Sequence, residues 1–353
     1  MSDVIQGSHL NQSILKRRWE KFKTLKRGYY SLILLLCVYG ISFFLPLLIN
    51  NRALIVKYNS EYYFPVFSGY VSGKTFNQDV PGEARYRKLK QEFIKDNNDN
   101  WVLLPPYPYS PFEDITFEGN KMYEPPSRVH WMGTDNTGRD VFARLCYAFN
   151  ISISFALMLT IINYIIGILI GGAMGYFGGK FDLIFQRLVE IWSNLPMLFV
   201  IIILSSIIKP SFYLLIGIYT LVNWISMTYL MRAEFYREKS KAYVAAALSM
   251  GQSEFKVMFK HILPNSLVPI ITYFPFAVVA GISALVGLDF LGFGLAPPTP
   301  SWGQMLDVGL QNIRKWWMVF APVSAQFLTL LCIVFIGEGV REAFDPKVYS
   351  RLR

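Results

Sequence analysis

The chain alternates long apolar runs with polar segments. Each run is about as long as a helix that crosses a bilayer, which needs about 20 residues at a rise of about 1.5 Å per residue. The runs occupy residues 29–49, 149–177, 182–208, 211–231, 266–288 and 317–337. A soluble core would interrupt such runs with polar faces. The pattern predicts an all-α integral membrane protein with six transmembrane helices.

Two polar regions separate the first run from the second. Residues 50–130 mix prolines and aromatic residues with charged residues and contain no run able to cross a membrane. We expect a folded extracytoplasmic insertion of mixed structure there, with a short strand at 101–105. Its role stays open between a docking surface or lid and a purely structural insertion. Residues 131–148 then predict an interfacial helix that starts near Asn136 and presents one apolar face.

Composition and charge agree with a membrane protein. Of the 353 residues, 53% are hydrophobic and only 16% are charged, against about 25% charged in a typical soluble protein. Much of the net charge of +10 comes from the arm at 1–28. Because basic residues beside a span stay in the cytoplasm, we expect this arm and the tail at 339–353 to lie inside. A basic arm directly before a span favours a topology signal or lipid contact over nucleic-acid binding.

Motifs that carry chemistry are scarce. The segment 69–75 resembles a phosphate-binding loop, but only three residues separate its glycines where that motif needs four. Cys37, Cys146 and Cys332 have no metal or disulfide spacing. We therefore expect no catalytic residue, cofactor site or metal site in this chain. Any chemical energy that the protein uses must come from a partner protein. A secondary transporter would need an acidic residue in the middle of a span and an internal repeat, and we find neither feature. An intramembrane hydrolase would need a catalytic motif in its spans, and we find no such motif.

Small and kinking residues mark the second and third runs. Gly167, Gly171 and Gly175 recur at every fourth position, which predicts a smooth stripe for close helix packing. In the third run, Pro196 predicts a kink. Arg187 and Glu190 lie one turn apart in the same run and are able to pair. Whether that pair is structural or part of an intracellular gate stays open.

The fifth run is rich in small residues and prolines. This composition suits a helix that lines a path better than one that faces lipid. The segment 288–306, rich in glycine and proline, follows it and predicts a tight turn at the outer face. The candidate gate or path residues are Pro275, Ala280, Gly281, Ala284, Phe290, Leu291 and Phe293.

The polar segment 232–265 lies between the fourth and fifth runs and predicts two short helices joined by a bend. Gly251 suits the left-handed conformation that closes a helix, and Pro264 is expected to end the second helix. Nearby lysines and arginines predict that this segment is cytoplasmic. The second helix is expected to carry one apolar face comprising Phe255, Met258, Phe259 and Ile262.

This segment resembles the EAA loop of ABC importer permeases, in which E-A-A precedes a glycine and a hydrophobe-x-Leu-Pro ending. The matching positions are Ala246, Ala247, Gly251, Leu263 and Pro264. Ala245 stands where the family has glutamate and His261 where it often has isoleucine, so no salt bridge can run from position 245 to an ATPase. The residues that the resemblance implies for ATPase coupling are Ala245, Ala246, Ala247, Gly251, Phe255, Phe259, Leu263 and Pro264.

Other strings narrow the resemblance. GTDNTGRD at 133–140 and the strings FLGFG and PPTPSWG within 290–303 are similar to those of dipeptide and oligopeptide permeases of the second type. The long insertion, including 53–65, is most similar to the Yej-type permeases for oligopeptides and microcin C. The resemblance implies a type I ABC importer permease fold, with a five-helix core at 149–338 after the first helix. Nickel and glutathione importers share these strings and stay as alternatives.

The resemblance also implies a working assembly. The chain would be the transmembrane subunit of an ATP-driven peptide importer in the bacterial inner membrane, operating by alternating access. It would pair with a homologous second permease and receive peptide from a periplasmic solute-binding protein. ATP and magnesium would bind to a partner ABC ATPase, present as one double-length chain or two chains.

Overall fold

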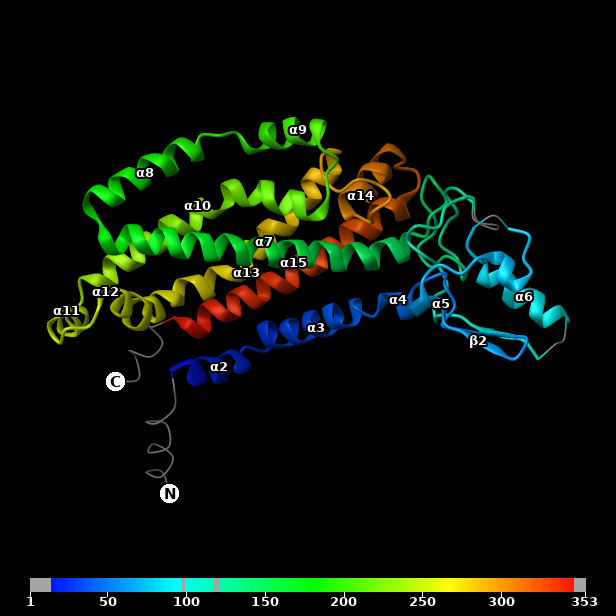
Figure 1. Cartoon of the computed structure of the whole chain (residues 1–353), viewed down its shortest axis with the longest axis horizontal. Coiled ribbons are helices and arrows are strands. Elements are labelled where there is room, and N and C mark those ends of the chain that lie inside the picture. The colour runs from blue at the N-terminus through cyan, green and yellow to red at the C-terminus, as the bar shows by residue number, and fades with distance from the viewer. Residues whose placement is uncertain (1–13, 81, 97–98, 117–120, 346–353) are drawn as a thin grey trace, which may run out of the picture.

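Long helices run side by side along the long axis of the molecule (Figure 1). A small region of mixed structure lies at one end, and a bent helical segment at 242–262, which we call the elbow, lies at the other. The computed structural model describes residues 14–80, 82–96, 99–116 and 121–345. The first part of the basic arm and the last part of the tail, both named above, lie outside these residues.

Most of the apolar runs form long helices. The helices of this part are α3 (Lys26–Ser42), α4 (Leu45–Leu48), α7 (Val141–Phe177), α8 (Gly179–Ser193), α9 (Met197–Ile207), α10 (Phe212–Lys239), α13 (Leu263–Phe290) and α15 (Trp316–Phe344). Four unbroken helical stretches are long and apolar enough to cross a membrane, and the bent pair α8–α9 adds a fifth candidate. The all-helical membrane architecture is confirmed. Because α3 has only 17 residues, the count of six spans stays a prediction.

Helix α7 is the centre of the packing. Ala148, Ile153 and Ala156 of α7 lie in one buried cluster with residues of α13, α15 and the short helix α14 (Trp302–Gln311). The opposite part of α7 packs against α10 and the elbow. Outside this bundle, α2 (Ile14–Thr24) of the basic arm places Phe22, which is buried, in a cluster with residues of α15.

The third run is broken at the expected place. Helices α8 and α9 meet at an angle of 66°, and Pro196 stands directly before α9. Proline lacks a backbone N–H and interrupts the hydrogen-bond ladder of a helix. Arg187 and Glu190 of α8 form the expected ion pair, with 2.6 Å between Nη1 and Oε2.

The expected interfacial helix at 131–148 is wrong in its boundaries. Helix α7 begins at Val141 and continues without a break to Phe177, and Asp140 caps it by accepting a hydrogen bond from the backbone N–H of Ala143 at 2.7 Å. Asp135 instead closes a turn, since its Oδ1 accepts from the backbone N–H of Thr137 at 2.8 Å. The carboxylate of Asp135 is therefore occupied in a turn, and the helix starts after Asp140 instead.

The insertion at 50–130 contains a small antiparallel sheet in the order β2-β1-β3. Its strands are β1 (Ile55–Tyr58), β2 (Glu61–Tyr63) and β3 (Trp101–Leu103), and the register pairs Val56 with both Tyr63 and Val102. Helices α5 (Pro65–Ser68), η1 (Gly73–Phe76) and α6 (Tyr86–Asp96) complete it. Val56, Leu89 and Phe93 lie in its own buried core, so the expected mixed structure with a strand near 101 is confirmed.

Candidate coupling elbow and translocation path

The elbow consists of α11 (Ala242–Ser249), a turn at 250–253, α12 (Glu254–Lys256) and the π-helix η2 (Val257–Ile262). Gly251 has a φ of +78°, the left-handed conformation that glycine adopts without a steric cost. Its N–H donates to the carbonyl oxygen of Leu248 at 2.9 Å. Across the bend, the side chains of Gln252 and His261 are joined by a hydrogen bond of 2.8 Å.

The expected end of the second helix at Pro264 is wrong. Helical structure continues from Glu254 through η2 into α13, without a gap. The π-helix ends at Ile262, so Pro264 falls in the first turn of α13. Proline has no N–H to donate, and Pro264 lies where the π-helix passes into α13, so the missing hydrogen bond coincides with the change of helix type.

The apolar residues of the elbow divide between two faces. Met258 and Ile262 are buried with Val244 and Ala247 against Phe235 of α10. Phe255 and Phe259, which we expected on the same face, are 69% and 51% exposed. The wider i→i+5 turns of a π-helix separate these residues around the axis. We call the exposed set the elbow patch, which comprises Leu248, Met250, Phe255 and Phe259.

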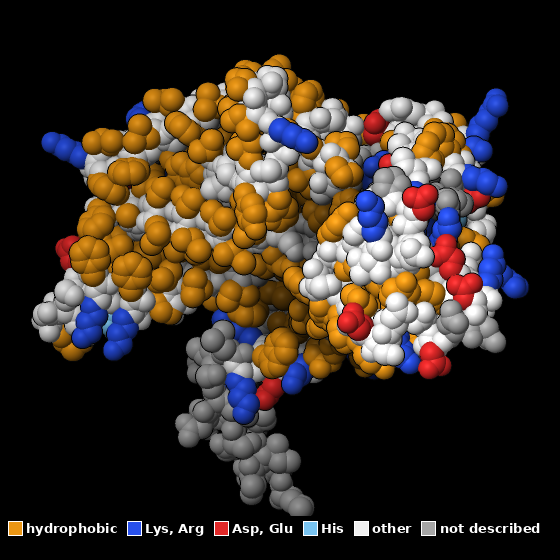
Figure 2. All heavy atoms as spheres, turned by 45° about the vertical axis from the view of Figure 1, so that its right-hand side comes forward, with side chains coloured by type: hydrophobic (Ala, Val, Ile, Leu, Met, Phe, Trp, Pro, Cys, Tyr) orange, Lys and Arg blue, Asp and Glu red, His pale blue; other side chains and the backbone are white. Residues whose placement is uncertain are grey.

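The other residues expected in coupling divide in the same way. Ala245 and Ala246 are exposed beside the elbow patch, Ala247 is buried, Leu263 is half-buried and Pro264 is exposed. Basic side chains gather beside the elbow, and apolar side chains cover the long helices between it and the charged insertion (Figure 2). The elbow therefore presents small and apolar groups with basic residues around them.

Polar contacts fix the start of the elbow. Glu238, at the end of α10, accepts hydrogen bonds from Lys241 Nζ at 2.7 Å and from the Tyr243 hydroxyl at 2.9 Å. Burial, together with the hydrogen bond to Glu238, raises the pKa of Tyr243 above its ordinary value. Tyr243 therefore stays a hydrogen-bond donor, and α11 is tied to the helix that precedes it.

The glycine stripe faces α10. A Cβ added at Gly167 would lie 2.6 Å from Cβ of Met227, and one added at Gly171 or Gly175 would meet the backbone carbonyl of Thr228 or Arg232. A Cβ atom does not come this close to a neighbouring heavy atom in real proteins, so glycine fits along this contact where a larger residue would force a shift.

A cavity of about 430 Å³ lies between α7, α10 and α13, and we call it the path cavity. Ala280, Gly281 and Ala284 line it, together with Asn163 of α7 and Asn223 of α10. Four of the candidate path or gate residues lie elsewhere. Pro275 is buried and faces a separate cavity beside α3 and α15, and Phe290, Leu291 and Phe293 lie at the end of α13 and in the turn after it.

That turn is held by a residue which sequence reasoning missed. The carboxylate of Asp289 accepts hydrogen bonds from the backbone N–H of Leu295 at 2.6 Å and from the hydroxyl of Ser301 at 2.5 Å. Phe293 packs into the buried cluster between α7, α9 and α10, whereas Leu291 is 52% exposed. The expected tight turn is present, and a single buried carboxylate organises it.

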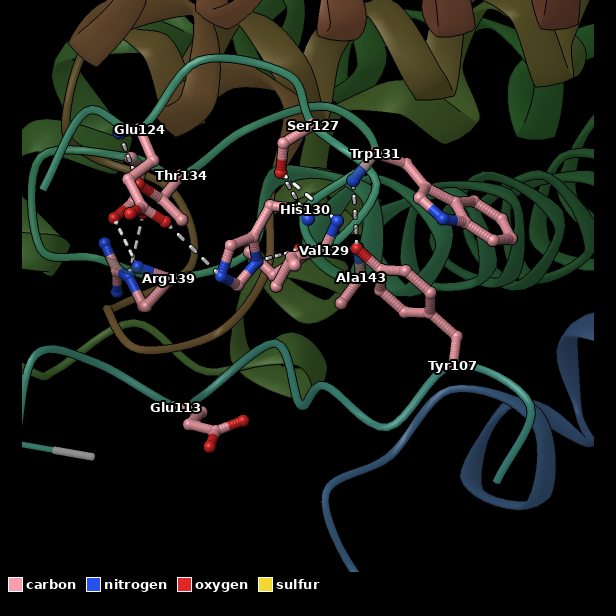
Figure 3. Close-up of polar contacts among 12 residues, drawn as sticks. Tyr107, Glu113, Glu124, Ser127, Val129, His130, Trp131, Thr134, Arg139 and Ala143 are labelled. Carbon is pink, nitrogen blue, oxygen red and sulfur yellow. Dashed lines mark hydrogen bonds and ion pairs between the residues drawn. The ribbon is translucent and has the colours of Figure 1, made fainter. Parts of the chain in front are cut away.

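A buried polar network lies where the insertion meets α7 (Figure 3). His130, only 2% exposed, places Nδ1 2.8 Å from Oδ2 of Asp140, which also accepts from the Tyr107 hydroxyl at 2.6 Å. Burial raises the pKa of Tyr107, and the negative charge of Asp140 raises it further, so the hydroxyl stays a donor. The GTDNTGRD string thus anchors the first residues of α7, and Gly133 and Gly138 have positive φ in its turns.

Comparison with known proteins shows which family this chain belongs to. A family described as the binding-protein-dependent transport system inner membrane component matches residues 167–350. The inner membrane ABC transporter permease protein YejE of Escherichia coli K12 is 40% identical over 333 residues, which cover 94% of this chain and 96% of that protein. The chain belongs to this family of ABC transporter permeases. The permease is accordingly a multi-pass inner membrane component of a transport system.

Two further relatives show how far the similarity extends. The peptidoglycan transport system permease protein YejE of Agrobacterium fabrum C58 is 35% identical over 94% of the permease and 93% of its own length. The dipeptide transport system permease protein DppC of Bacillus subtilis 168 is 37% identical over 64% of the permease and 71% of its own length. The two YejE relatives therefore align with nearly the whole permease, while the dipeptide permease aligns with a smaller part.

Proposed function

We propose that this permease is a Yej-type transmembrane subunit of an ATP-driven importer for peptides. The observation that carries the proposal is its 40% identity to the YejE permease over 94% of the chain. Relatives named for dipeptide, oligopeptide and peptidoglycan transport support a peptide or peptide-like cargo. The described residues also contain no cluster of acidic, histidine and cysteine side chains suited to a metal.

The elbow is proposed to be the contact with a partner ABC ATPase, which would bind ATP and magnesium and carry out hydrolysis. The elbow patch supports this role, because large apolar side chains exposed together at the tip of a helical hairpin fit a hydrophobic groove. A groove that grips the patch differently in two states would shift the helices between inward-open and outward-open forms. Gly251 would set the angle at which force enters α13.

The rest of the assembly follows from the same proposal. A homologous second permease would complete the path, and a periplasmic solute-binding protein would deliver peptide at the end that carries the insertion. Lys239, Lys241, Lys256 and Lys260 around the elbow support a cytoplasmic position for it and for both termini. In that orientation the insertion is periplasmic, and the long helices between contact membrane lipid.

Replacement of one elbow-patch residue tests the coupling role. Phe255→Asp places a charge in the proposed groove contact, and we expect it to weaken association with the ATPase about tenfold or more. Phe67→Asp is the matched control for association with the ATPase, because Phe67 is similarly exposed, at 73%, but lies on the insertion at the other end of the molecule. The measurement is the amount of ATPase that co-purifies with each variant, together with uptake of a labelled peptide into vesicles.

Unchanged association of Phe255→Asp with the ATPase would remove the elbow from the coupling role. Transport of peptide by the pure permease without any ATPase would overturn the importer proposal itself.

A further inference from the structure

Asn163 of α7 places a buried amide in the middle of a membrane helix. Its side chain is 6% exposed, and its Oδ1 has no hydrogen-bond partner among the described residues. Leaving such a group unpaired is destabilising in a protein interior, and in a bilayer no lipid tail can replace the missing partner. A leucine would fill the position without this cost, so the amide needs another explanation.

The surroundings of Asn163 point to a ligand. Asn163 lines the path cavity, whose volume of about 430 Å³ lies in the range of small-molecule sites. Asn223 and Ser226 line the facing wall from α10, and both are exposed. Exposed polar side chains within a membrane helix face a water-filled path or a protein partner rather than lipid. The polar groups of two helices therefore meet at one space.

The cavity is neutral and has room for a backbone. None of the side chains that line it is charged. On α13 the small residues Ala280, Gly281 and Ala284 line one part of the cavity, and the rings of Tyr273 and Phe276 line another. Nδ2 of Asn223, a lining residue, donates to the carbonyl oxygen of Tyr219 at 3.1 Å, which leaves its Oδ1 as an acceptor. A side-chain amide carries both a donor and an acceptor, as a peptide group does, so the two can form a matched pair of hydrogen bonds.

We infer that Asn163, with Asn223, binds the main-chain amide groups of a peptide as it passes through the path cavity. The inference rests on the proposed peptide-import function and adds what the permease itself reads. Because the site is uncharged, it recognises the backbone common to all peptides and is indifferent to the charge of their side chains. The permease then discriminates peptide from non-peptide cargo, and side-chain preference is left to other components.

The test compares a labelled peptide with its depsipeptides, in which one amide N–H is replaced by an ester oxygen at each position in turn. Uptake is measured in vesicles that hold the full importer with wild-type permease or with Asn163→Leu. At a position read by the cavity, the wild type should favour the amide over the ester about fivefold to tenfold. Any preference of the solute-binding protein is the same for every variant and cancels when the amide-to-ester ratios are compared.

Asn163→Leu should reduce the amide-to-ester ratio to that of the binding protein alone. Its thermal midpoint should be no lower than that of the wild type, because the leucine removes an amide oxygen that has no partner among the described residues. Asn150→Leu is the matched control on the same helix, since its amide already donates to the Ser42 hydroxyl at 2.8 Å; its ratio should equal that of the wild type. An unchanged ratio in Asn163→Leu would overturn the inference even if peptide is imported. Absence of peptide uptake by the wild type would instead overturn the proposed function.

Discussion

Asp182 and Arg232 form a two-point ion pair that joins the start of α8 to the elbow end of α10. Arg232 Nε lies 2.5 Å from Oδ1 of Asp182, and Nη2 lies 2.6 Å from Oδ2. The Asp182 side chain is only 7% exposed, whereas Arg232 is 28% exposed. Most large apolar residues of α8 are exposed in this chain, so the ion pair is a principal contact that holds α8 to α10.

Substitution of this pair should reveal the contribution of this contact. Arg232→Lys keeps the charge but loses the two-point geometry, and Arg232→Ala leaves Asp182 buried without its partner. We expect the alanine variant to lose about 1–3 kcal/mol and the lysine variant less. Thermal unfolding in detergent measures both losses. A double-mutant cycle with Asp182→Asn that gives no coupling energy would show that the two residues act independently.

The glycine stripe predicts a difference between two single-methyl substitutions. A Cβ at Gly171 would meet the backbone carbonyl of Thr228, whereas one at Gly217, within α10, would have no atom of the described part of the chain within 4 Å. Gly171→Ala should therefore force α7 and α10 apart and cost about 1–3 kcal/mol. Gly217→Ala should be neutral or stabilising by up to about 1 kcal/mol, because alanine favours the helix. Equal thermal midpoints for the two variants would contradict the close packing of these helices.

The network below the insertion predicts the effect of a single hydroxyl. Tyr107 donates to Asp140, the cap of α7, and accepts from the backbone N–H of Trp131 at 3.3 Å. Tyr107→Phe should cost about 1–2 kcal/mol, since it removes one bond to a charged group and leaves a backbone donor unpaired. Tyr109→Phe is the control, because the described residues give the hydroxyl of this neighbouring ring no hydrogen bond. A thermal midpoint lowered equally in both variants would assign the effect to ring packing.

Features set by local chemistry could be predicted from the sequence. The runs of apolar residues predict the long helices, Pro196 predicts the break between α8 and α9, and Gly251 predicts the left-handed turn of the elbow. Each depends on one residue type and its immediate neighbours. The spacing of Gly167, Gly171 and Gly175 also predicts a packing stripe, although it cannot identify α10 as the partner helix.

Features that depend on tertiary contacts could not be predicted in the same way. The π-helix before Pro264 divides the apolar face of the elbow, and a pattern that assumes 3.6 residues per turn does not contain this change. His130 and Tyr107 reach Asp140 from positions 10 and 33 residues earlier, a distance that periodicity does not bridge. The sequence shows that Asn163 is a polar residue in an apolar run. Only the structure shows that its side-chain oxygen has no hydrogen-bond partner among the described residues.

The conformation of Gly251 predicts which substitutions uncouple the elbow. Its φ of +78° is open to glycine and tolerated by asparagine, but a β-branched residue there is a genuine outlier. No atom of the described residues lies within 4 Å of an added Cβ, so a side chain would act through the backbone and not through a clash. Gly251→Val should therefore bend the elbow away from its angle at a cost of about 1–2 kcal/mol, while Gly251→Asn should keep that angle.

In vesicles that hold the full importer, we expect the valine variant to hydrolyse ATP but to import peptide about tenfold more slowly, and the asparagine variant to behave like the wild type. Equal impairment of both variants would instead locate the sensitivity in a side-chain contact with the ATPase, and normal uptake by both would remove the glycine bend from the coupling mechanism.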